Sequence, residues 1–369
     1  MPLAEELLGH AAAAGLGVCM ERANGPRGAA AVRSGAARLD GLALRERSDL
    51  LRDALLTDLP DDYPRVEAVV RTALKDPEFT GWMIWPVTEA VVSRALEATE
   101  SDAFESSLEL LADLTPRLTA EFAIRRVLVA DLERALKIVE RWVHHPDEHV
   151  RRLATEGTRP RLPWAIRVPG ILARPRATLP ILDALYRDPS EYVRRSVANH
   201  VNDISHADPD LAVDVVTRWA AAPDDHTPRL IRHALRTAVK KGHPGALALL
   251  GFEPAAGVTL TGLELTAARV TVGEELAFTF QLENTGDAPA KLAIDYVIHY
   301  QKANGRTAPK VFKLTTRTLG AGERLSISRR HSFKRISTRV FHPGSHALEL
   351  QINGVAQGKA GFDLVVPAP

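Results

Sequence analysis

The sequence predicts two architectures in one chain: repeated α-helices up to about residue 252, and a β-sandwich from about residue 257 to the end. Three observations predict this division. Apolar residues recur at helical spacing through the first region. A short motif in that region returns after 43 residues. Beyond Gly257 the apolar residues alternate with polar ones, as they do in half-buried strands.

The helices of the first region are indicated by apolar residues at i, i+3 and i+4. Proline and glycine fall between these segments rather than within them, as expected for residues that end helices. The clearest helical segments are Leu50–Leu56, Val87–Leu96, Ser107–Leu114, Phe122–Ala130 and Leu132–Val143.

The repeated motif joins a proline, an apolar residue and a basic pair. Residues 147–152 read Asp-Glu-His-Val-Arg-Arg, residues 190–195 read Ser-Glu-Tyr-Val-Arg-Arg, and residues 228–233 hold a degenerate copy, Pro-Arg-Leu-Ile-Arg-His. The 43-residue offset between the first two is the period of paired-helix HEAT units. Stacked units would align the basic residues along one concave surface, either to bind a polyanion or simply to face solvent.

In the β-region the clearest alternation is that of Leu276, Phe278, Phe280 and Leu282 with polar or small residues, up to a turn at 284–287. About seven strands in roughly 110 residues predict an immunoglobulin-like β-sandwich. The likeness is one of architecture, because the region lacks a cysteine pair and tryptophan. The further strands expected are Ile294–Tyr300, Val311–Thr316, Leu325–Ser328, Leu348–Ile352 and Phe362–Val366.

Charge is segregated although the net charge is only +1. Between Arg151 and Arg176 there are seven arginines and one acid, and between Lys302 and Arg339 there are eleven basic residues and one acid. Two such windows predict a polyanionic partner held at two places.

Several function classes are disfavoured. The single cysteine, Cys19, permits neither a disulfide framework nor a cysteine-based zinc site. His145 and His149 are four residues apart, but Pro146 lies between them and the zinc-protease order is absent, so we expect no metal site. There is no glycine-rich phosphate loop, and no apolar run is long enough to span a membrane. We expect a cytoplasmic protein that needs no cofactor or nucleotide.

One segment is chemically unusual. A helix predicted from about Asp147 ends with Glu156 and Gly157, and a stiff loop rich in proline and arginine leads to Trp164. A carboxylate at a helix C-terminus opposes the helix dipole, so Glu156 needs nearby arginines or a functional role. Trp164 follows a proline in the loop, where function and packing are equally plausible.

Three runs resemble the bacterial DNA alkylation repair glycosylases of the AlkC type. They are residues 145–164 (the unusual segment with its flanks), residues 188–203 (the second repeat) and residues 79–89, Phe-Thr-Gly-Trp-Met-Ile-Trp-Pro-Val-Thr-Glu. The similarity covers about residues 1–250, and some family members carry an immunoglobulin-like C-terminal domain.

The resemblance implies hydrolysis of the N-glycosidic bond of N3-alkylated bases such as 3-methyladenine and 3-methylcytosine in duplex DNA. Carboxylates and a tryptophan would stabilise the cationic sugar without a base-flipping pocket. Glu156 and Trp164 match the catalytic segment, Glu121 matches a second acidic position, and Asp203 is a weaker candidate whose alternative role is capping or solvation. The expected phosphate contacts are Arg152, Arg159, Arg161, Arg194 and Arg195.

The β-domain is also expected to bind DNA. A loop that contains Lys302, Arg306 and Lys310 could hold the duplex against the helices of a monomeric enzyme. Two alternatives stay open. The chain could be a DNA-binding relative without catalytic activity, or a HEAT-type protein scaffold, which predicts a less basic concave face.

Overall fold

The structure is a computed structural model that describes residues 3–100, 102–336 and 339–367. Helices come first and strands follow, as the sequence predicts: the last helix ends at Leu249 and the first strand begins at Val258. None of the helices in the described residues has the length and apolar character that crossing a membrane requires.

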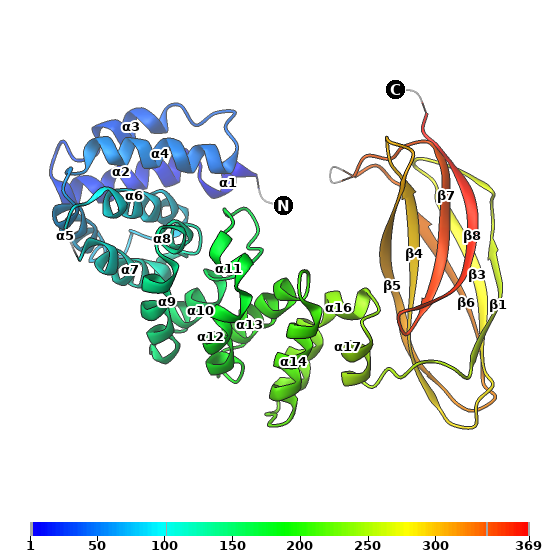
Figure 1. Cartoon of the computed structure of the whole chain (residues 1–369). Helices are drawn as coiled ribbons and strands as arrows, with labels where there is room; N and C mark the ends of the chain where they lie inside the picture. The colour runs from blue at the N-terminus through cyan, green and yellow to red at the C-terminus, as the bar shows by residue number, and fades with distance from the viewer. Residues whose placement is uncertain (1–2, 101, 337–338, 368–369) are drawn as a thin grey trace. The chain divides into compact units, whose positions relative to one another are not determined.

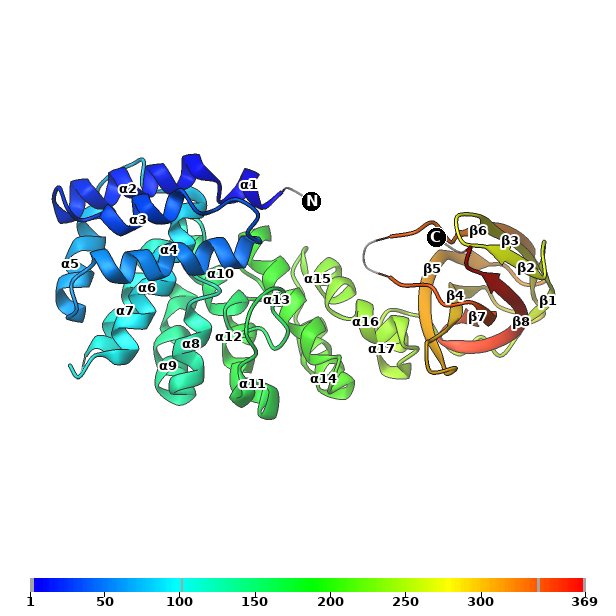
Figure 2. The same cartoon turned by 90° about the horizontal axis from the view of Figure 1, so that it is seen from above.

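Between residues 4 and 204 the α-helices stack one after another (Figures 1 and 2), and further α-helices follow in the sequence up to Leu249. They are α1 (Ala4–Leu7), α2 (His10–Asn24), α3 (Ala30–Ala36), α4 (Leu44–Asp58), α5 (Tyr63–Ala73), α6 (Ile84–Glu97), α7 (Ala103–Leu114), α8 (Ile124–Ala130), α9 (Leu132–Val139), α10 (Glu148–Glu156), α11 (Pro169–Ala173), α12 (Leu179–Leu185), α13 (Glu191–Ile204), α14 (Pro209–Ala220), α15 (Thr227–Ala234), α16 (Arg236–Lys240) and α17 (Pro244–Leu249). Short 3-10 turns lie at Gly81–Met83, Thr115–Arg117, Glu140–His144 and Pro175–Thr178.

The repeated motif forms three helices that pack in succession, because α10 packs against α13 and α13 packs against α15. Each copy buries its apolar residue: Val150, Val193 and Ile231 are 5% exposed or less. Just before each helix, the side chain of His145, Asp188 or Asp224 accepts a hydrogen bond from the backbone amide two residues later. The three helices therefore begin in the same way. The 43-residue period therefore corresponds to a physical repeat.

The β-domain is a sandwich of two sheets, with strand orders β1-β3-β6 and β2-β8-β7-β4-β5. All neighbours are antiparallel except β2 and β8. The alternation at Leu276–Leu282 places the four apolar side chains in the core between the sheets, each 2% exposed or less. The strands are β1 (Val258–Leu265), β2 (Arg269–Thr271), β3 (Glu275–Asn284), β4 (Ala290–Gln301), β5 (Thr307–Leu319), β6 (Arg324–Ser332), β7 (Gly344–Ile352) and β8 (Val355–Val365).

Compact packing divides the chain at a different place from the helix-to-strand boundary. One unit contains residues 1–204 and 222–234, and the other contains residues 205–221 and 235–369. The second unit therefore joins α14, α16 and α17 to the sandwich. Gly242 allows this close packing, because a Cβ there would lie 2.6 Å from the carbonyl oxygen of Gly354. Asn353 also donates to the carbonyl of Glu253 at 2.6 Å.

Candidate functional site

Five side chains predicted as site residues form one alternating row of carboxylates and guanidinium groups. Arg152 binds Glu121, and its Nη2 lies 3.5 Å from Oε1 of Glu156. Nη1 of Arg159 lies 2.6 Å from the same Oε1. On its other side Arg159 makes a two-pronged contact with Asp203, at 2.9 and 3.2 Å. The fold thus joins residues from α10, from the turn after it, from the segment before α8 and from α13.

The row is largely removed from water. Glu156 is 6% exposed and Asp203 is 5% exposed. Burial acts to lower the pKa of Arg152 and Arg159, but the neighbouring carboxylates outweigh it and raise the pKa of both. Within the row three carboxylates face two guanidinium groups, and a third guanidinium, that of Arg125, interacts electrostatically with Asp203 and Glu121. Water screens these charges poorly because the site is buried.

Glu156 is held in one orientation by α13. The hydroxyl of Ser196 donates to its Oε2 at 2.7 Å, and Thr155 in turn bonds to Ser196. His200, one turn further along α13, is fully buried, and burial lowers its pKa to about 4. It is therefore neutral near pH 7, and its Nδ1 donates to the carbonyl of Thr155 at 3.0 Å. These residues were missed in the sequence because a serine or histidine in an amphipathic helix carries no distinctive pattern.

The loop after α10 is built around a buried guanidinium. Arg125 donates to the carbonyls of Gly157, Arg159 and Ile166 at 2.5 to 3.0 Å. Burial lowers the pKa of Arg125 to about 10. Gly157 ends α10 as predicted, but its φ of −63° is an ordinary helical value. Glycine is required there by space, because a Cβ would lie 2.7 Å from a methyl group of Ile124.

Trp164 is exposed, unlike the carboxylates of the row, with 63% of its surface accessible. Its φ of 63° places the backbone in the left-handed region, which costs a non-glycine residue about 1 to 3 kcal/mol. Such strain persists only where neighbouring groups enforce it. By contrast Trp142 and Trp219 are buried in the helical layers, at 4% and 2% exposure.

A second cluster contacts the Trp164 backbone. Arg45, from α4, donates to the carbonyl of Trp164 at 3.2 Å and to Oε1 of Glu89 at 3.2 Å. Its guanidinium lies 4.8 Å from the ring centre of Trp85, which stacks on Phe122 at 4.5 Å. Sequence reasoning missed this cluster. The available signal was the aromatic and acidic run at residues 79–89, which supported the resemblance but was not assigned to the site.

In the first two copies of the motif, the two adjacent arginines have different roles. The first arginine binds main-chain carbonyls of the preceding turn: Arg151 donates to residues 145 and 146, and Arg194 donates to residues 188 and 189. Arg194 is only 9% exposed, so its position shapes the repeat. The second arginine differs between the copies. Arg152 joins the carboxylate row, whereas Arg195 is exposed and lies 3.4 Å from Glu191.

The remaining predicted DNA contacts are exposed. Arg161 lies in the loop after α10, and its backbone amide donates to Asp203 at 3.1 Å. Lys302 and Arg306 close the exposed turn between β4 and β5, where the amide of Lys302 donates to the carbonyl of Arg306 at 2.8 Å. Lys310 follows on β5 and lies over the ring of Phe312 at 5.3 Å.

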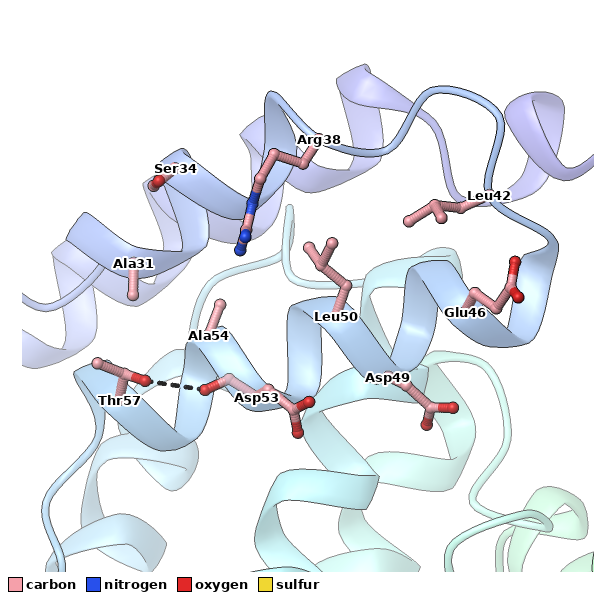
Figure 3. A pocket seen from close by; sticks show the side chains of 10 residues that line it. All are labelled: Ala31, Ser34, Arg38, Leu42, Glu46, Asp49, Leu50, Asp53, Ala54 and Thr57. Carbon is pink, nitrogen blue, oxygen red and sulfur yellow. Dashed lines mark hydrogen bonds between the residues drawn. The ribbon is translucent and has the colours of Figure 1, made fainter.

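Two hollows in the helical region lie away from the row. One, of about 600 Å³, lies between α3 and α4 (Figure 3). Glu46, Asp49 and Asp53 are among its lining residues, so its charge is unfavourable for a phosphate. The other, of about 510 Å³, lies at the starts of α10 and α13.

Comparison with known proteins gives consistent matches. Residues 98–241 match the family described as DNA alkylation repair enzyme, and residues 259–366 match the C-terminal Ig-like domain of the uncharacterised protein YhaZ. The chain is 38% identical to the uncharacterized protein YhaZ of Bacillus subtilis (strain 168) over 325 residues, which is 88% of each protein.

A solved structure matches almost the whole chain. It is the Pseudomonas fluorescens alkylpurine DNA glycosylase AlkC bound to DNA containing an abasic site analog, with a TM-score of 0.88 and 35% identity. The match covers 99% of this chain and 100% of that chain.

The match of the helical repeats to this family identifies the chain as a DNA alkylation repair enzyme. Within that class, the chain belongs to the AlkC family of DNA glycosylases, and it carries a C-terminal immunoglobulin-like domain.

Proposed function

We propose that this protein binds duplex DNA and hydrolyses the N-glycosidic bond of N3-alkylated bases, among them 3-methyladenine and 3-methylcytosine. The observation that carries the proposal is the buried row in which Glu121, Glu156 and Asp203 alternate with two arginines. The AlkC relative is an alkylpurine DNA glycosylase bound to DNA containing an abasic site analog, which supports both the reaction class and the partner.

The chemistry suits the charge of the row. An N3-alkylated base is cationic, so the bond from C1′ breaks with its electron pair passing to the base, which leaves as a neutral molecule. Positive charge then grows on the sugar, and a fixed carboxylate stabilises it more in the transition state than in the substrate. Water adds to C1′ and its proton passes to a carboxylate or to solvent. Glu156 and Asp203 are the proposed electrostatic groups, with Glu121 completing the row.

Trp164 is the proposed contact to the sugar. Its exposed ring can meet DNA, and a tryptophan face attracts a cation. We propose that the base is not flipped into a pocket, as the resemblance to the helical-repeat glycosylases implies.

The proposed DNA contacts follow from exposure. Arg161 and Arg195 are exposed and are proposed to contact phosphates, as are Lys302, Arg306 and Lys310 in the β-domain. Arg152, Arg159 and Arg194 are already engaged with protein groups and are proposed to arrange the site. The proposed glycosylase domain is residues 1–252 and the proposed immunoglobulin-like domain is residues 257–369. We propose that a monomer suffices.

The test is incubation with duplex DNA containing a single 3-methylcytosine or 3-methyladenine, followed by alkali. We expect strand cleavage at the lesion, from the abasic site left by base release, and none in the matched unmodified duplex. Binding to either duplex without any abasic site would refute the proposal and favour a DNA-binding protein without catalytic activity.

A further inference from the structure

The turn that presents Trp164 is held from a distant part of the chain. Its backbone is left-handed at Trp164, a conformation that an L-residue leaves unless something retains it. Arg125 fixes the carbonyl of Ile166, two residues later, at 2.5 Å. At Trp164 itself the carbonyl accepts a bond of 3.2 Å from Nη2 of Arg45, which lies 119 residues earlier in the chain.

Arg45 is itself fixed on the side away from Trp164. Its Nη1 lies 3.2 Å from Oε1 of Glu89, a carboxylate that is 3% exposed. The guanidinium also covers the rings of Trp85 and Phe122, at 4.8 and 5.9 Å from their centres. A planar group held by an ion pair and by aromatic faces keeps few rotamers, so its bond to Trp164 has a defined direction.

The same cluster adjoins the carboxylate row. Phe122 directly follows Glu121 in the sequence, and Glu121 binds Arg152. The same group of side chains therefore positions both the Trp164 turn and the Glu121 end of the carboxylate row.

We infer that Arg45 is a positioning residue for base excision, because it ties the strained Trp164 turn to the Trp85–Phe122–Glu89 cluster. This inference rests on the proposed function of Trp164 as the contact to the sugar. Once the tie is lost, the backbone can relax to negative φ and turn the indole ring away from where the sugar would lie. Misplacement of a group on this scale slows a reaction while leaving most of the binding surface intact.

The chain offers a matched control in Arg126. It also binds Glu89, with Nη1 at 3.7 Å from Oε2 and 3.2 Å from the main-chain oxygen, and it donates to Ser93. No contact joins Arg126 to Trp164 among the described interactions. Arg126→Gln therefore perturbs the same buried carboxylate without touching the tie.

The experiment uses the full-length protein labelled with 5-fluorotryptophan, whose five tryptophans give five fluorine resonances. The Trp164 resonance is assigned by its loss in Trp164→Phe. In Arg45→Gln we expect it to shift and to show a mobile side chain, while Trp142 and Trp219 stay unchanged. Arg45→Lys, which keeps the charge but not the two-pronged geometry, should give an intermediate spectrum.

Excision is measured in parallel, under single-turnover conditions, on duplex DNA with one 3-methylcytosine. Arg45→Gln should lower the rate about ten-fold and Arg45→Lys by less. Affinity for a duplex with an abasic-site analogue should stay within about three-fold, and Arg126→Gln should excise within about two-fold of wild type.

An unchanged Trp164 resonance in Arg45→Gln would overturn the inference, as would a moved resonance with an unchanged rate. Equal loss of excision in Arg126→Gln would assign the effect to Glu89 instead. A wild-type protein that releases no base would refute the proposed function, whereas the fluorine spectra would still decide whether Arg45 holds Trp164.

Discussion

Replacing Glu156 by glutamine tests the electrostatic role of the carboxylate row most directly. The substitution keeps the size of the side chain and removes one charge. Glu156 is 6% exposed and accepts hydrogen bonds from Ser196 and Arg159. The row then contains two carboxylates and two guanidinium groups, so the site loses one negative charge.

The size of the effect follows from Coulomb's law. A full charge about 5 Å from a cationic sugar is worth about 3 kcal/mol at an effective dielectric constant of about 20. A barrier higher by that amount slows base release by roughly a hundred-fold or somewhat more. DNA binding should change little, because Glu156 is buried and faces arginines rather than solvent.

The assay is single-turnover excision of 3-methylcytosine from a duplex, followed by alkali, with affinity measured on the same DNA. Ser196→Ala is the matched control, since it removes a bond to the same carboxylate but keeps the charge. We expect it to slow excision by about ten-fold or less. Equal rates for Glu156→Gln and wild type, or a larger loss in Ser196→Ala than in Glu156→Gln, would refute the electrostatic reasoning.

Three other predictions address binding and stability. Arg195→Ala should weaken binding to damaged and plain duplex alike and should reduce the slope of log affinity against log salt concentration by about 0.9; an unchanged slope would contradict the phosphate contact. Arg194→Ala should instead mainly lower the thermal midpoint of unfolding, because its guanidinium binds main-chain carbonyls. If the β-domain contacts DNA, replacing both Lys302 and Arg306 by alanine should lower the affinity for duplex DNA and the excision rate by similar factors. Wild-type affinity and wild-type excision rate at physiological salt would contradict this contact. Burial raises the pKa of Asp295 from 3.8 to about 6, so the folded state holds this proton more tightly than the unfolded state and loses stability as pH rises from about 4 to 6. Asp295→Asn should therefore raise the free energy of unfolding at pH 8 by up to about 3 kcal/mol, with no gain below about pH 4. The measurement is urea unfolding followed in the β-sheet dichroism band, and the same gain at both pH values would contradict the prediction.

Much of the architecture was predictable because it is encoded in short spacings. The 43-residue return of the motif corresponds to α10 and α13 packed side by side. The alternation from Leu276 to Leu282 becomes the inner face of β3. Such patterns survive in one sequence because each element must bury its own apolar face.

The candidate site was predicted only in part. Glu121, Glu156 and Asp203 were singled out, and the structure joins them through Arg152 and Arg159, which had been expected to contact phosphates. A guanidinium group fits a carboxylate and a phosphate equally well, so composition cannot decide between them.

The sequence by itself determined the order of the two architectures, the repeat and the acidic and aromatic candidates. Tertiary structure alone decided which partner each charge finds. Arg151 and Arg152 are adjacent, yet Arg151 binds Asp188 and main-chain carbonyls of the preceding turn, whereas Arg152 binds Glu121. Arg45 meets Trp164 across 119 residues. The physical reason is that burial of an apolar face depends on neighbours within a helical turn or a strand, whereas the partner of a charged side chain depends on which distant segments the packing brings within about 3 Å.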